Sequence, residues 1–219
     1  MTPDFWIYYT ILLVSSGYGI FHFRKMPAWL KGITLICLLT FVTEVIARIL
    51  AYTIENSNPP YHIYVISCYA LLSYTYAKLY NSIRSIRYYC IITAGILTIF
   101  SIINSLYVQP FDTFPSHAIL LSSTFTLVLP LVSLTRMLLY AGKGPLLAEP
   151  SFWFNAGNLI LYPTSFFYWG FYNILTATKE MPDFFENMIA FFTLLTYLFY
   201  GISIYLGIKA QPNDIQLRR

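Results

Sequence analysis

Long apolar segments alternate with short polar ones along the whole chain. The apolar segments are residues 5–23, 33–54, 62–80, 88–108, 117–140, 153–175 and 184–208. Each is roughly 20 residues long, the length that a helix needs to cross the hydrocarbon core of a bilayer. The pattern therefore predicts an all-α membrane protein, a bundle of seven transmembrane helices forming one domain over residues 1–219.

Composition supports membrane insertion. Of the 219 residues, 58% are hydrophobic and only 10% are charged, and the mean hydropathy is +0.62. A soluble globule of this size needs more polar surface than this. The first segment has no basic residue before it and no small-residue cleavage pattern after it, so we expect a retained helix and not a secretory signal.

The basic residues predict the orientation of the bundle. All Lys and Arg residues except Arg48 and Lys179 fall on the same side of the seven predicted spans. Because basic loops stay in the cytoplasm, the N-terminus is predicted to lie outside and the C-terminus in the cytoplasm. This asymmetry also accounts for the net charge of +4, so we expect contact with membrane lipid and no nucleic-acid partner.

The second segment carries an acid and a base inside its apolar run. Glu44 lies near the middle of the predicted span, and Arg48 lies one turn further along on the same face. A lone charge at this depth costs roughly 2.5–3.5 kcal/mol on insertion scales, so such residues usually face a protein interior or a wet cavity. We therefore expect the Glu44–Arg48 pair to form the wall of a ligand-binding site.

Other polar residues share the outer depth of this pair. They come from the third to sixth segments and complete the candidate site: His62, Asn104, His117, Trp169, Tyr172 and Asn173. The hypothesis is one outward-facing pocket lined by these residues. The alternative is that they form hydrogen bonds between helices, with the histidines simply hydrated at the membrane interface.

The sixth segment has a polar face along its whole length. Asn155, Asn158, Tyr162, Ser165 and Trp169 recur at spacings of three and four. This face either lines a translocation path or packs inside a tyrosine-rich bundle. Short matches at displacements of 118 to 124 residues also permit a three-plus-one-plus-three repeat, although chance matches are common in so biased a composition.

Several classes of chemistry lack their sequence motifs. The seventh segment has no lysine before Lys209 to bind retinal, and no zinc-protease, serine-hydrolase or phosphate-binding motif occurs. Cys37, Cys68 and Cys90 are scattered singly, which indicates neither a metal site nor a disulfide framework. We expect no cofactor, no metal and no enzymatic activity. A membrane-embedded hydrolase is left open, since Glu44 and Arg48 match part of a prenyl-protease motif whose second acid is replaced by Thr43.

Three short motifs carry a resemblance to a known family. They are Tyr61-His-Ile-Tyr64, Phe100-Ser-Ile-Ile-Asn-Ser-Leu-Tyr-Val-Gln109, and Phe152-Trp-Phe-Asn155 with Gly157-Asn-Leu-Ile160. In these motifs the chain resembles uncharacterised bacterial integral membrane proteins with seven helices. Members are often encoded beside two-component histidine kinases, so the resemblance implies an inner-membrane signalling protein with a histidine kinase as partner. It carries over no ligand residues.

Two classes of function therefore remain open. The first is a receptor-like sensor, whose outer pocket around Glu44 and Arg48 binds a small amphiphilic ligand and whose bundle signals to a cytoplasmic or membrane partner. The alternative is a transporter of small solutes or amphiphiles with the three-plus-one-plus-three architecture. The sequence predicts no oligomeric state.

Overall fold

The computed structural model describes residues 3–139, 145–178 and 183–210, without the side chains of 3–5, 173–178, 183 and 186. Over these ranges the chain is helical, with no strand, which confirms the predicted all-α class. The described residues form seven α-helices: α1 (Pro3–Phe21), α2 (Ala28–Thr53), α3 (Pro59–Leu79), α4 (Arg84–Ile103), α5 (Ser116–Leu139), α6 (Pro150–Thr178) and α7 (Asp183–Lys209). Two short 3-10 turns, Phe23–Lys25 and Leu146–Ala148, precede α2 and α6.

Prolines mark the start of several helices. Pro27 precedes α2, whereas Pro59 and Pro150 are the first residues of α3 and α6. Proline suits these positions because its fixed φ fits the first turn and its missing N–H would have no partner there. Consequently α2 begins five residues before the apolar run at 33. Pro130 and Pro163 lie inside α5 and α6 without ending them.

Four helices in the described part of the chain are long and apolar enough to cross a membrane: Ala28–Thr53, Arg84–Val108, Ser116–Leu139 and Asn187–Lys209. The outer face of α4 supports this assignment, since Ile91, Ile92, Ile96 and Ile99 are all exposed. A row of exposed isoleucines suits lipid and not water. The chain is therefore a membrane protein. The count of seven spans stays a prediction, because α3 is rich in tyrosine, α6 also contains asparagines, and the apolar part of α1, Trp6–Phe21, is short.

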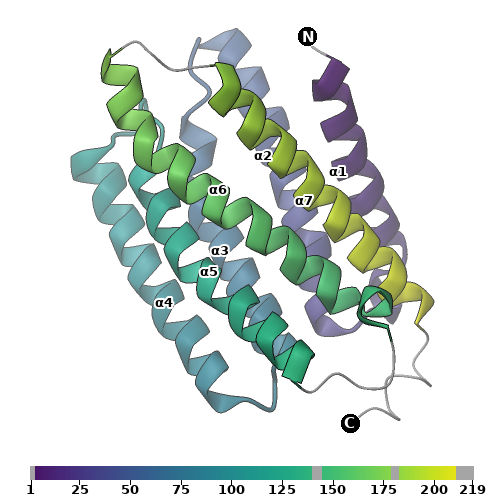
Figure 1. Ribbon diagram of the computed structural model, residues 1–219. Helices are drawn as coiled ribbons and strands as arrows, with labels where there is room; N and C mark the ends of the chain where they lie inside the picture. Colours follow the sequence, from purple (N-terminus) through teal and green to yellow (C-terminus); the bar gives the residue numbers. More distant parts are fainter. Residues whose placement is uncertain (1–2, 140–144, 179–182, 211–219) are drawn as a thin grey trace.

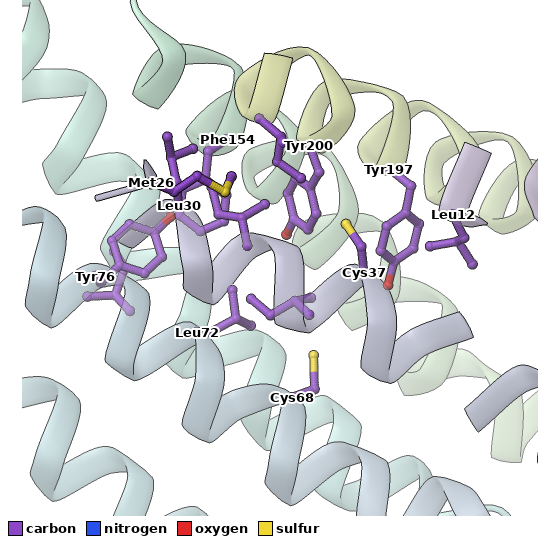
Figure 2. Packing of buried hydrophobic residues seen from close by; sticks show 14 of the residues in the cluster. Leu12, Met26, Leu30, Cys37, Cys68, Leu72, Tyr76, Phe154, Tyr197 and Tyr200 are labelled. Carbon is purple, nitrogen blue, oxygen red and sulfur yellow. The ribbon is translucent and has the colours of Figure 1, made fainter. Parts of the chain in front are cut away.

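The helices form a closed ring in chain order (Figure 1). Each helix packs against the next one along the chain, and α7 packs against α1 to close the ring, with α2 also touching α7 across the interior. The main apolar core includes Leu30, Ile33 and Cys37 of α2. Figure 2 shows Tyr76, Phe154 and Tyr200 gathered around this helix from α3, α6 and α7.

Successive helices run in opposite directions. We call the end at which α1, α3, α5 and α7 begin the upper end, as it is drawn in Figure 1, and the end at which they finish the lower end. The upper end therefore carries the connections that follow α2, α4 and α6. Glu44 and the other candidate site residues belong to helix segments near this end, whereas the predicted basic loops belong to the lower end.

A π-helical turn, Asn104–Val108, ends α4 at the upper end. Apolar periodicity does not distinguish such a turn from a continuing α-helix, and the sequence analysis treats residues 88–108 as one segment. The backbone N–H of Gln109 closes the turn by donating to the carbonyl of Asn104 at 2.7 Å. π-turns are rare in proteins, and a large share of them occur at functional sites.

Candidate functional site

A partly open cavity of about 190 Å³ lies in the upper half of the bundle. Residues of α1, α2, α3, α5, α6 and α7 line it, together with Phe114 from the connection between α4 and α5. The polar and aromatic part of the lining includes Tyr8, Thr40, Glu44, Tyr61, Tyr64, Tyr69, Ser122, Ser123, Tyr162, Ser165, Trp169, Thr193 and Tyr197. Two of the predicted site residues, Glu44 and Trp169, thus line the same cavity.

Glu44 is half-buried on α2 and faces this cavity. Its carboxylate accepts a hydrogen bond from Tyr61 Oη at 3.3 Å. Arg48 is also half-buried, and it interacts electrostatically with both Glu44 and Tyr9 of α1. Arg48 and Tyr9 are not among the lining residues, so the acid reaches the cavity while the base lies beside it.

Three aromatic rings continue the wall from Glu44. The ring of Tyr61 lies 5.1 Å from that of Phe114, and Phe114 stacks on Trp169 with centroids 4.1 Å apart and planes inclined by 16°. Tyr172 packs against Trp169 at 5.0 Å, outside the described lining. The sequence analysis missed Phe114, because it lies in a short polar connection between Pro110 and Pro115 and has no helical periodicity.

The deep side of the cavity is formed by hydroxyl groups. Thr40 Oγ1 lies 3.1 Å from Tyr64 Oη and 2.9 Å from Tyr197 Oη, and the two phenols are 3.2 Å apart. These three groups satisfy one another. Ser123 differs from them, because its hydroxyl is buried against the cavity without a hydrogen-bond partner in the described part of the chain. Buried polar groups are rarely left so, but this oxygen is inaccessible to solvent and does not face the open part of the cavity.

His62 lies at the upper end but outside the cavity lining. Its ring is buried, with Nδ1 2.7 Å from Ser105 Oγ and Nε2 2.9 Å from the carbonyl oxygen of Thr113. The histidine therefore connects α3 to the π-turn and to the loop that follows it. This arrangement matches the alternative of a hydrogen bond between segments.

Asn104 and His117 are joined by Gln109, which the sequence analysis did not single out. Gln109 Oε1 accepts hydrogen bonds from Asn104 Nδ2 at 3.0 Å and from the backbone N–H of His117 at 3.1 Å. Gln109 Nε2 donates to Ser116 Oγ at 2.8 Å. This cluster fixes the connection between α4 and α5 and is separate from the cavity lining. The side chain of Asn173 lies outside the described residues.

The lower half of the bundle contains a second polar cluster, which is closed. Tyr76 Oη donates to Asn155 Oδ1 and accepts from Asn158 Nδ2, both at 3.0 Å, and Tyr200 Oη donates to Asn158 Oδ1. All four residues are at most 1% exposed. We call these residues the lower network. The polar face predicted on α6 is therefore divided, since Tyr162, Ser165 and Trp169 line the cavity whereas both asparagines belong to the lower network.

Within the described ranges, no three His, Cys, Asp or Glu residues come together in a way that could hold a metal ion. The three cysteines are free and buried. The chemistry that the cavity offers is consequently that of one carboxylate, several hydroxyls and a wall of aromatic rings. These are groups that can hold a ligand through hydrogen bonds, charge and ring contacts.

No protein-family model, curated protein or solved structure matches the chain.

Proposed function

We propose that this protein is a receptor-like membrane sensor that binds a small molecule in the upper cavity. In this proposal the chain spans the membrane seven times, with the upper end outside the cell and the lower end in the cytoplasm. Binding changes the packing of the helices, and a partner at the cytoplasmic face responds to that change. A ligand can shift such an equilibrium only by as much as its affinity differs between the two states.

The observation that carries the proposal is the upper cavity and the charge that reaches it. The cavity of about 190 Å³ is partly open, and Glu44 is the only charged residue among the described residues that line it. In the lower network, by contrast, each phenol and amide has a partner within the protein. This arrangement suits a receptor. A receptor binds its ligand in a site of this kind, and the ligand does not need to pass through the closed region below.

The lower end supports the proposed partner contact. Its exposed basic side chains include Lys25, Lys78, Arg84, Arg87 and Arg136. Such residues are attracted to the anionic lipids of a cytoplasmic leaflet, which is the physical basis of the predicted orientation. The resemblance described above suggests an inner-membrane location and a histidine kinase as the protein that contacts this end.

A small-solute transporter with three-plus-one-plus-three architecture is the competing proposal. Its support is the polar face of α6 and the weak sequence repeat. A transporter must also open toward the lower end, and this requires breaking hydrogen bonds among Tyr76, Asn158 and Tyr200 that are fully buried. We favour the receptor because its ligand need not cross that barrier.

The test uses the full-length protein in lipid nanodiscs and in proteoliposomes. The probes are isoamylamine, isoamyl alcohol and isovalerate, which have similar size and different charge. We expect at least one probe to raise the melting temperature of the wild type and not that of Ser123→Leu, which fills the cavity. Thr124→Leu is the matched control, since Thr124 is exposed on the same helix. We also expect no counterflow of that probe across the proteoliposome membrane.

Two results would contradict the proposal. If a probe still stabilises Ser123→Leu, it binds outside the cavity. If the stabilisation is lost in both Ser123→Leu and Thr124→Leu, the loss is not specific to the cavity. Probe-specific counterflow that Ser123→Leu abolishes would establish the transporter instead.

A further inference from the structure

The charge and the rings of the upper cavity define the class of its ligand. We infer that the cavity binds a small organic cation, an amine whose ammonium group pairs with Glu44 beside the rings of Tyr61, Phe114 and Trp169. This inference rests on the proposed function, because it names the ligand class of the same site. It goes beyond that proposal by excluding anionic ligands and neutral ones.

Charge is the first argument. Among the described residues that line the cavity, Glu44 is the only one with a charged side chain, and no Lys, Arg or His contributes to the lining. A carboxylate that is withdrawn from water loses hydration energy, which a cation in contact with it offsets. Arg48 interacts with both Glu44 and Tyr9 but is not among the lining residues, so the Glu44 carboxylate is the charged group that a ligand in the cavity would meet.

The aromatic wall is the second argument. The rings of Tyr61, Phe114 and Trp169 are in contact with one another and begin at the Glu44 carboxylate. The face of an aromatic ring carries negative partial charge and attracts ammonium groups, most strongly in the case of tryptophan. A carboxylate beside such rings therefore provides two attractions for the same positive charge.

Size and apolar lining restrict the rest of the molecule. The volume of about 190 Å³ is below the roughly 300–1,000 Å³ of pockets for drug-sized ligands. The remaining wall includes Val65, Leu72, Ile119, Leu161 and Ile189. A short hydrocarbon group attached to the ammonium fits this lining. A hydrated inorganic cation would instead leave the apolar side chains in contact with water. Isoamylamine has this form and serves as the probe.

The decisive experiment measures probe binding to the full-length protein in nanodiscs by calorimetry. We expect isoamylamine to bind the wild type and Glu44→Gln to weaken this binding by about tenfold or more, as loss of a charge-assisted contact predicts. Glu55→Gln is the matched control, because Glu55 is exposed at the same end of α2. It should change the affinity by less than about twofold, as an exposed charge is screened.

Arg48→Met provides a second variant that separates cation from anion. If the ligand is a cation, removal of Arg48 leaves Glu44 less compensated, so isoamylamine affinity is retained or raised. If the ligand is an anion held by Arg48, isovalerate binds the wild type and is lost in this variant.

The outcomes separate the two proposals. Suppose that isoamyl alcohol or isovalerate binds, that Ser123→Leu abolishes this binding, and that isoamylamine does not bind. The inference of a cationic ligand would then be wrong, and the proposed receptor function would stand. Amine binding that is equal in wild type and Glu44→Gln would also overturn the cation inference. If none of the three probes binds, both proposals fail.

Discussion

The upper and lower halves of the bundle use the same residue types in opposite ways. Both halves are rich in tyrosine, and in both the phenols of different helices meet near the axis. In the lower network, Asn158 binds Tyr76 and Tyr200 at once, and all three are at most 1% exposed. In the upper half, rings and hydroxyls surround a cavity. The lesson is that polarity alone does not make a site; a site also needs space beside its polar groups.

Glycines contribute to this difference because they determine how closely helices approach. A Cβ added to Gly32, at the lower end of α2, would overlap the Oγ1 of Thr75 on α3. A Cβ on Gly170, near the upper end of α6, would lie 3.7 Å from Leu120, an ordinary contact. Small residues let membrane helices pack closely. The helices consequently pack more closely at Gly32 in the lower half than at Gly170 in the upper half, where the cavity lies.

The largest effect is expected from Asn158→Ala in the lower network. The substitution removes the acceptor of Tyr200 and one donor to Tyr76, leaving buried polar groups unpaired at a cost of about 1–3 kcal/mol. The free energy of unfolding, measured in mixed micelles, should fall by this amount. Asn187→Ala, at an exposed position of α7, should change it little. Equal effects of the two variants would show that the lower network contributes no specific stability.

Gly32→Ala comes next, because it forces α2 and α3 apart in the lower half. Inserting a methyl group into a packed contact typically costs about 1–3 kcal/mol. Gly95→Ala is the control, since a Cβ at Gly95 meets no atom within 4 Å. Its better helix propensity should stabilise the protein by up to about 1 kcal/mol. If Gly32→Ala were as stable as Gly95→Ala, close packing would not distinguish the lower half.

Thr40→Val tests the hydroxyl cluster on the deep side of the cavity, with a smaller expected effect. Tyr64 and Tyr197 remain within 3.2 Å of each other and can still bond, so the loss should be near 0.5–1.5 kcal/mol. Thr53→Val, at the exposed end of α2, is the control. A loss that exceeds the one caused by Asn158→Ala would mean that the cavity wall, and not the lower network, holds the bundle together.

Trp169→Leu is the variant whose clearest effect should be on binding. The Trp169 ring packs against Phe114, Tyr168 and Tyr172, each such pair being worth about 0.5–1.5 kcal/mol, and leucine retains part of the buried area. Isoamylamine affinity should fall several-fold because the ring next to the ammonium is lost. Trp153→Leu, at the lower end of the same helix, should leave the affinity unchanged. If Trp169→Leu and Trp153→Leu had the same affinity for isoamylamine, Trp169 would not contribute to the binding site.

Much of the fold follows from the apolar pattern. Each of the seven apolar segments contains most of one helix, because unsatisfied backbone groups in lipid leave the chain few alternatives to helices. Helix starts were less predictable, since Trp29 and Lys31 belong to the first turns of α2 although they flank the apolar run. The orientation, the seven spans and the repeat stay predictions.

The candidate site was only partly predictable, for a geometric reason. Sequence position gives the depth of a residue along its helix, and Glu44, Trp169 and His62 were all predicted to lie in the outer part of the bundle. It does not give the direction in which each helix face points after packing. Glu44 and Trp169 face the cavity, whereas His62 faces the turn after α4. Phe114 and Gln109 lie in or beside a connection, where no periodicity indicates a role.

By itself, the sequence determined the class of protein, the order of its helices and the position of the acid along α2. These features depend on hydrophobicity summed over about 20 residues, which neighbouring helices do not change. Only the tertiary structure decided that the polar face of α6 divides into a closed network and a cavity wall. That division depends on which side chains of α3 and α7 lie opposite each residue of α6, and the rotation of packed helices sets those pairs.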